Sequence, residues 1–148
     1  MSHHVLVLSG PNLAALGSRE PEIYGTLTLD DLQGQVVDEA AALGLEATCR
    51  QTDDEGELVG WLHEAAAAGW DVVLNPAAFT HYSYAVGDAC AHLVGMGSRL
   101  VEVHLSNPAA RETFRHTSVV ARSATGTIAG FGAGSYLLAL RALAAQDR

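Results

Sequence analysis

An imidazole and a carboxylate two residues apart, in a stretch with the alternation of a β-strand, are the side chains best suited to chemistry in this sequence. From Val101 to Asn107, apolar residues alternate with Glu102, His104 and Ser106, so these polar groups share one strand face. Polar groups on an apolar strand are costly unless they are hydrogen-bonded or line a cavity. A histidine placed there can give or take a proton near neutral pH. The alternative is an ordinary solvated sheet face.

Polar residues also follow two other apolar strands. Asn75 ends one of them, and the run Ser9–Asn12 ends the other. Open α/β sheets bind ligands at the carboxyl ends of their strands. Three strands that deliver polar side chains at that edge therefore favour a ligand site over a solvated face.

A long segment from Gly10 to Leu27 contains an arginine five residues before a tyrosine, Arg19 and Tyr24. Loops of this length without regular structure are often lids or binding loops. A guanidinium close to a phenol stabilises the phenolate and lowers its pKa from about 10, which would make Tyr24 a base near neutral pH. The alternative is that both residues are surface side chains without a role.

Strands and helices alternate along the chain, which predicts a parallel sheet covered by helices on both faces. The predicted strands are Val5–Ser9, Glu46–Gln51, Val72–Asn75, Leu100–His104 and Thr127–Ala129. The predicted helices run from Thr28 to Gly44, from Asp53 to Gly69, from Ser83 to about Leu93 and from Ser135 to Ala144, with a short helix over Ala109–His116. No repeat or linker interrupts the pattern, so we expect one domain over residues 1–148.

The charge balance limits the classes of partner. The formal net charge is −9, which argues against binding to nucleic acid or to an anionic membrane. All eight basic residues are arginine, so no side chain can form a Schiff base and no phosphate-loop lysine exists. An anionic substrate must be held by arginine, backbone N–H groups or neutral donors.

Membrane, export and metal patterns are missing from the sequence. No apolar run reaches membrane-spanning length and no signal-peptide pattern opens the chain, so we expect a cytoplasmic protein. The histidines lack metal-site spacing, and so do the two cysteines, Cys49 and Cys90. Both thiols are expected to be buried and free.

Four motifs, taken in order, resemble those of the type II 3-dehydroquinate dehydratase family. They are Gly10–Leu13 with Leu16–Gly25, then Asn75–Ser83, then Glu102–Asn107, and finally Ala110–His116. The similarity runs from about Val5 to Leu143. It implies a flavodoxin-like three-layer α/β sandwich with a five-stranded parallel sheet of order 2-1-3-4-5. It also implies a homododecamer built of four trimers and a site without metal or organic cofactor.

The same resemblance implies a reaction, the removal of water from 3-dehydroquinate to give the enone 3-dehydroshikimate, in the shikimate pathway or in quinate catabolism. Tyr24, as a phenolate stabilised by Arg19, takes the proton next to the ketone. Asn12 helps to place a water that stabilises the enolate. His104 then protonates the departing hydroxyl, and Glu102, on the same strand face, orients or charges the imidazole.

The remaining matches imply a set of substrate contacts. They are Asn75, His81, Ser106, the backbone N–H of Leu105, Arg115 from a neighbouring loop, and Asp88, which would reach the substrate across a trimer contact. Arg111, one helical turn from Arg115, is either a further contact or an exposed ion-paired residue.

The chain departs from the family pattern at Ala77, where a glycine is common, and at Gly87, where an arginine is frequent. The first position lies in the substrate loop and the second beside the expected contact between subunits. Two other functions stay open: a paralogue that acts on a related cyclic hydroxy acid such as quinate, and a non-catalytic flavodoxin-like binding protein. Retention of both the acid and the base argues against the second, because a binding protein needs neither.

Overall fold

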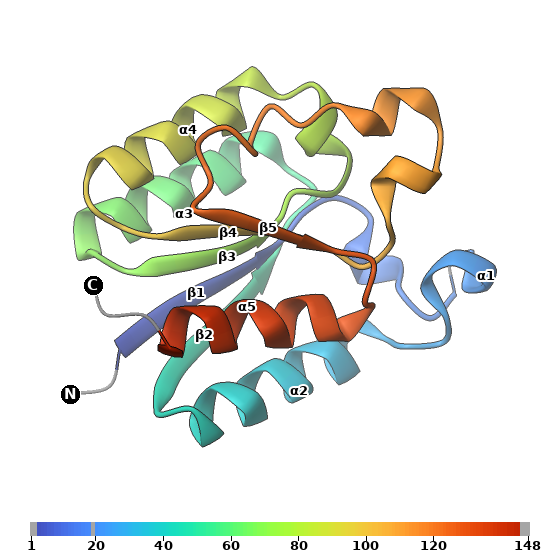
Figure 1. Cartoon of the computed structure of the whole chain (residues 1–148), viewed down its shortest axis with the longest axis horizontal. Helices are drawn as coiled ribbons and strands as arrows, with labels where there is room; N and C mark the ends of the chain where they lie inside the picture. Colours follow the sequence, from blue (N-terminus) through green and yellow to red (C-terminus); the bar gives the residue numbers. More distant parts are fainter. Residues whose placement is uncertain (1–2, 19, 146–148) are drawn as a thin grey trace.

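The computed structural model describes residues 3–18 and 20–145, which form an open α/β sandwich (Figure 1). Its five strands are β1 (His3–Ser9), β2 (Leu45–Gln51), β3 (Asp71–Asn75), β4 (Leu100–His104) and β5 (Gly126–Ala129). All neighbouring pairs are parallel, and the order across the sheet is β2-β1-β3-β4-β5. The predicted flavodoxin-like arrangement is therefore confirmed.

Helices cover both faces of the sheet (Figure 1). Helices α2 (Leu29–Ala42) and α5 (Ala133–Ala145) lie on one face, and α3 (Glu55–Ala68) and α4 (Tyr84–Gly95) lie on the other. Successive side chains of a strand point to opposite faces, so each central strand supplies two apolar cores. Val5 and Val7 pack with α2 and α5, whereas Leu6 and Leu8 pack with α3 and α4. Burial on both faces is the usual state of a parallel sheet.

Side chains that precede the helices fix where they begin. Thr28 Oγ1 accepts a hydrogen bond from Asp31 N at 3.1 Å, and Thr28 N donates to Asp31 Oδ2 at 3.2 Å, which is a reciprocal capping box. The side chain of Asp54 caps α3 and that of Ser83 caps α4, each by accepting a bond from the backbone three residues on. These starts agree with the sequence analysis.

The predicted helix over Ala109–His116 is wrong. The segment forms two separate 3₁₀ helices, η3 (Pro108–Ala110) and η4 (Thr113–His116), because Arg111 between them has an extended backbone, with φ −114° and ψ −160°. Asn107 Oδ1 accepts a bond from Ala109 N at 3.2 Å and starts the first of them. Arg111 and Arg115 therefore do not lie one turn apart on a common helix.

The segment from Gly10 to Leu27, expected to lack regular structure, contains two short helices. They are η1 (Leu13–Ala15) and α1 (Pro21–Tyr24), and Pro21 stands at the first turn of α1, where its fixed φ favours helix. Leu13 and Leu16 are buried in the core beneath α2 and α5. The segment is thus packed on the core before it reaches Arg19, which lies outside the described residues.

The two thiols are free, as expected, although only Cys90 is fully buried and Cys49 is half-buried. Burial raises the pKa of Cys49 to about 11 and that of Cys90 to about 12, so neither is a thiolate at neutral pH. Among the described residues, no helix is long and apolar enough to cross a membrane.

A buried ion pair lies at the opposite end of the sheet from the polar strand ends, where β3 begins. The Asp71 carboxylate accepts hydrogen bonds from Arg99 N, Nε and Nη2 at 2.8, 3.0 and 2.8 Å, and it lies 2.6 Å from His3 Nε2. Burial alone would raise the pKa of Asp71, but the hydrogen bonds from Arg99 and His3 outweigh it and hold the pKa below its usual value. The pair therefore stabilises the fold above about pH 4, and this contribution is lost as the pH falls through the folded-state pKa.

Replacing Asp71 by asparagine is expected to lower the free energy of unfolding at pH 7 by about 3 kcal/mol, because the Arg99 guanidinium stays buried without its carboxylate. The difference from wild type is expected to shrink below about pH 4, where the wild-type carboxyl also takes up its proton. Urea unfolding at several pH values measures both effects, with Asp38→Asn on the exposed side of α2 as the control. Wild-type stability of Asp71→Asn at pH 7 would contradict the prediction.

Candidate active site

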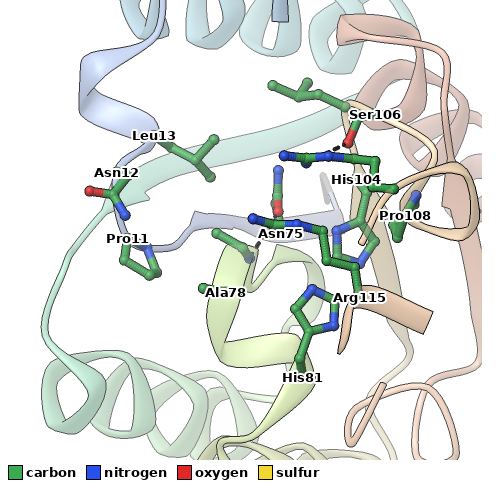
Figure 2. A pocket seen from close by; sticks show the side chains of 13 residues that line it. Pro11, Asn12, Leu13, Asn75, Ala78, His81, His104, Ser106, Pro108 and Arg115 are labelled. Carbon is green, nitrogen blue, oxygen red and sulfur yellow. Dashed lines mark hydrogen bonds between the residues drawn. The ribbon is translucent and has the colours of Figure 1, made fainter. Parts of the chain in front are cut away.

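A pocket opens at the carboxyl ends of β1, β3 and β4 (Figure 2). The strands β2 and β3 lie on opposite sides of β1, so the pocket sits at the topological switch point, where open α/β sheets bind ligands. The pocket is open to solvent, and its empty space, together with the solvent at its mouth, amounts to about 530 Å³. Seven of the predicted site residues line it: Asn12, Asn75, His81, His104, Leu105, Ser106 and Arg115.

The predicted pairing of Glu102 with His104 is present in the structure. Glu102 is 3% exposed, and its Oε2 lies 2.6 Å from His104 Nε2. Because an ionised carboxylate only accepts hydrogen bonds, Nε2 carries a proton. The other ring nitrogen, Nδ1, is the atom through which His104 can exchange a proton with a ligand in the pocket.

In His81 the roles of the two ring nitrogens are reversed relative to those in His104. Its Nδ1 lies 2.8 Å from the carbonyl oxygen of Thr117, so Nδ1 carries the proton and Nε2 is left as an acceptor. Burial lowers the pKa of His81, and the nearby His104 and Arg115 lower it further, against the opposing effect of the Thr117 carbonyl. His81 is therefore neutral at pH 7 and suited to accept a bond from a hydroxyl.

Two arginines supply positive charge at the pocket. The side chains of Arg111 and Arg115 are only 14% and 16% exposed, and both line it. Arg111 Nη1 donates to Ser106 Oγ at 3.1 Å, and Arg115 Nε donates to Glu112 at 3.1 Å. The side chains of His81, His104 and Arg115 lie on one side of the pocket, across from Asn12 and Leu13 (Figure 2). Arg111 is therefore not an exposed residue, although it is ion-paired with Glu20 and Glu112; its contact with a substrate stays a prediction.

Asn75 and Ala77 form a tight turn at the end of β3. Asn75 Oδ1 accepts a hydrogen bond from Ala77 N at 3.0 Å, and Ala77 has a positive φ of 52°. That conformation is strained for a residue with a Cβ. The alanine in place of a common glycine therefore leaves the turn intact at some cost in stability.

A buried tyrosine, Tyr136, contacts the ends of β1 and β3 next to the pocket. The sequence analysis does not identify it. The Tyr136 hydroxyl lies 2.9 Å from Ser9 Oγ. Burial raises the pKa of Tyr136 to about 12, although hydrogen bonds to Ser9 and Asn75 act in the opposite direction. This phenol is therefore unsuited to act as a base at neutral pH, and its contact with Asn75 makes it part of the structure under the pocket.

Four predicted residues do not line the pocket in the described part of the chain: Glu102, which contacts His104, and three others. Arg19 lies outside the described residues. Tyr24 ends α1, but its side chain lies outside the described part of the chain. Asp88 is exposed on α4 and lines a second hollow with Tyr84, Gly87, Ser118, Val119 and Arg122. The ion pair of Arg111 with Glu20, at 3.9 Å, ties the segment just before α1 to the rim of the pocket.

The pocket combines a carboxylate-supported imidazole, a neutral imidazole and two guanidinium groups. This set can bind an anion, accept bonds from hydroxyls and transfer a proton. Within residues 3–18 and 20–145, no three histidine, cysteine or acidic side chains are grouped so that they could hold a metal ion. Fold and site together define a flavodoxin-like α/β protein equipped for acid–base chemistry on a small anion.

Comparison with known proteins gives the family. The model of the family described as dehydroquinase class II matches residues 3–144, and the chain belongs to this family. A 3-dehydroquinate dehydratase of Salinispora tropica is 59% identical over 144 residues, which cover 97% of this chain and 99% of that protein. One from Kineococcus radiotolerans is 54% identical over 96% of this chain and 95% of its own length. The crystal structure of the type II dehydroquinase from Propionibacterium acnes superposes with a TM-score of 0.94, at 52% identity, over 99% of both chains.

Proposed function

We propose that this chain removes water from 3-dehydroquinate to give 3-dehydroshikimate through an enolate, with Tyr24 as the base and His104 as the acid. The enzyme class follows from the family and from relatives named 3-dehydroquinate dehydratase that are 50–59% identical over nearly the whole chain. The observation that carries the assignment of the acid is the 2.6 Å contact between His104 and the buried Glu102.

The first step breaks the C–H bond next to the ring ketone. Tyr24, as a phenolate stabilised by the Arg19 guanidinium, takes this proton, and the electron pair moves onto the ketone oxygen. A water held with the help of Asn12 stabilises the resulting enolate. Asn12 supports this role by its place in the pocket wall, where its backbone N–H donates to Asp53 Oδ1 at 2.9 Å.

The second step expels the hydroxyl. His104, protonated on both nitrogens, gives the Nδ1 proton to the departing oxygen while Glu102 balances the charge of the imidazolium through Nε2. The enolate collapses to the enone and one water leaves. Glu102 is suited to this role because it is buried and bonded to His104. A hydrogen bond between opposite charges is stronger than one between neutral groups.

The remaining pocket residues hold the substrate. We assign the substrate carboxylate and the neighbouring hydroxyls to Asn75, Ser106, the Leu105 backbone N–H, His81 and Arg115, with Arg111 as a further contact. The two guanidinium groups support anion binding in a chain that lacks lysine, because an arginine can bind a carboxylate through two parallel bonds. His81, being neutral, supports a hydroxyl contact rather than a charged one.

The test is incubation of the purified protein with 3-dehydroquinate while the ultraviolet absorbance of the enone is followed. We expect rapid appearance of the enone, and none with quinate. Dehydration of a related hydroxy acid but not of 3-dehydroquinate would favour the paralogue. Binding of 3-dehydroquinate without any reaction would favour the non-catalytic protein. The same product serves the shikimate pathway or quinate catabolism.

We also propose that the chain assembles as a dodecamer of four trimers, in which Asp88 reaches the pocket of a neighbouring copy. The exposed position of Asp88 on α4, outside its own pocket, supports a role between subunits. Light scattering with sedimentation is expected to give twelve times the mass of one chain. A fully active monomer would contradict both the assembly and the role of Asp88, whereas a fully active trimer would contradict only the dodecamer.

A further inference from the structure

The hydroxyl of Ser118 is hydrogen-bonded to the carboxylate of Glu102, which in turn contacts the imidazole of His104. Ser118 Oγ donates to Glu102 Oε1 at 2.8 Å, while Glu102 Oε2 lies 2.6 Å from His104 Nε2. Ser118 Oγ also accepts bonds from the backbone N–H groups of Val120 and Ala121, at 3.2 and 3.0 Å. A hydroxyl has one proton and two lone pairs. Because two N–H groups occupy the lone pairs, the proton is directed at Glu102.

The carboxylate depends on these partners because water barely reaches it. Glu102 is 3% exposed, and a buried charge is costly unless its oxygens are bonded. Ser118 serves one oxygen and His104 the other. The other titratable groups nearby are Cys90 of α4, which the charge of Glu102 affects, and His81, which the charges of His104, Arg115 and Glu102 affect. Without Ser118 the carboxylate would have an unbonded oxygen and freedom to turn away from the imidazole.

The segment that carries Ser118, residues 117–119, is itself fixed on its neighbours. Val119 N donates to the Thr80 carbonyl at 2.8 Å, and the Thr117 carbonyl accepts from His81 Nδ1 at 2.8 Å. A Cβ added to Gly87 would lie 2.8 Å from the Val119 carbonyl oxygen, which is too close for the present backbone. The glycine at 87 therefore lets segment 117–119 lie directly against α4, and an arginine there would displace it.

We infer that Ser118 is a positioning residue for His104. It holds Glu102 so that the carboxylate keeps the Nε2 proton of the imidazole and leaves Nδ1 to the substrate. The adjacent Thr117 carbonyl fixes His81 in the opposite sense, with the proton on Nδ1. One segment of three residues thus sets which nitrogen of each pocket histidine meets the substrate. This inference rests on the proposed function.

The experiment compares three single variants of the full chain. Ser118→Ala is expected to lower kcat about 10- to 100-fold, the range for outer-shell partners that orient metal-bound histidines, with KM changed far less because the substrate contacts remain. Because the carboxylate beside the acid loses a hydrogen bond, the pH profile of kcat is expected to change as well. Ser118→Thr keeps the hydroxyl and is expected to restore most of kcat and the profile. Ser123→Ala removes a hydroxyl that makes none of these contacts and is expected to change neither.

Nitrogen-15 NMR of the imidazole rings tests the same inference without turnover. Ser118→Ala is expected to change the His104 signals far more than those of His81, whose bond to the Thr117 carbonyl remains. Gly87→Ala displaces the segment instead of removing the hydroxyl and is expected to change both rings, which keeps the test decisive if Ser118→Ala does not fold. Wild-type kcat, pH profile and His104 signals in folded Ser118→Ala would overturn the inference. If the wild type does not dehydrate 3-dehydroquinate but the His104 signals respond, the proposed function fails and the positioning role stands.

Discussion

Replacing Tyr24 by phenylalanine is expected to lower kcat for 3-dehydroquinate by at least about 100-fold, because the ring remains while the proton acceptor is lost. The fold is expected to persist, since the change removes a single hydroxyl from the end of a four-residue helix. Steady-state kinetics by enone absorbance, together with a thermal unfolding curve, measure the two quantities. Tyr82→Phe, which removes an exposed phenol that does not line the pocket, is the matched control.

Arg19→Ala separates the base from the group that activates it. Its loss at neutral pH is expected to be comparable to that of Tyr24→Phe. A phenol without a neighbouring cation titrates near pH 10, so the activity of Arg19→Ala is expected to climb as the pH rises toward that value, while Tyr24→Phe stays inactive. Near-wild-type turnover of Tyr24→Phe would show that another group takes the proton.

The fold was accessible from the sequence because its signals are local. Thr28, Asp54 and Ser83 are helix caps whose bonds reach only three residues along the chain, so their positions can be read from residue type. The apolar strands are equally local. Local signals do not determine the order of the sheet, however: alternation predicts parallel strands, and the order 2-1-3-4-5 follows from the family resemblance.

The parts of the site that the sequence analysis missed depend on contacts between distant residues. Ser118 acts on Glu102 across 16 positions, and Tyr136 meets Ser9 across 127, so no spacing rule could connect them. The sequence relates Arg111 to Arg115 through a predicted helix that does not form. Its pocket position depends on the extended backbone between two 3₁₀ helices, which residue type alone did not indicate.

His104→Ala is expected to lower dehydration by about 10²- to 10⁴-fold, the range for loss of a general acid. The base is untouched in this variant, so formation of the enolate is expected to continue. The enolate can then only return to substrate, because the hydroxyl receives no proton. In heavy water this return replaces the abstracted hydrogen by deuterium. Recovered 3-dehydroquinate is therefore expected to gain one deuterium faster than enone appears, whereas Tyr24→Phe loses both processes.

Glu102→Gln tests the contribution of the carboxylate to the same step. It keeps the size of the side chain but removes the charge that stabilises the imidazolium, so its dehydration rate is expected to fall between those of the wild type and His104→Ala. Mass spectrometry of the recovered substrate and enone absorbance follow the two processes in one reaction, with the exposed His92→Ala of α4 as the control. Parallel loss of exchange and dehydration in His104→Ala would mean that His104 acts before the enolate forms. Normal dehydration would make His104 a structural residue and leave the 2.6 Å contact with Glu102 without a part in the chemistry.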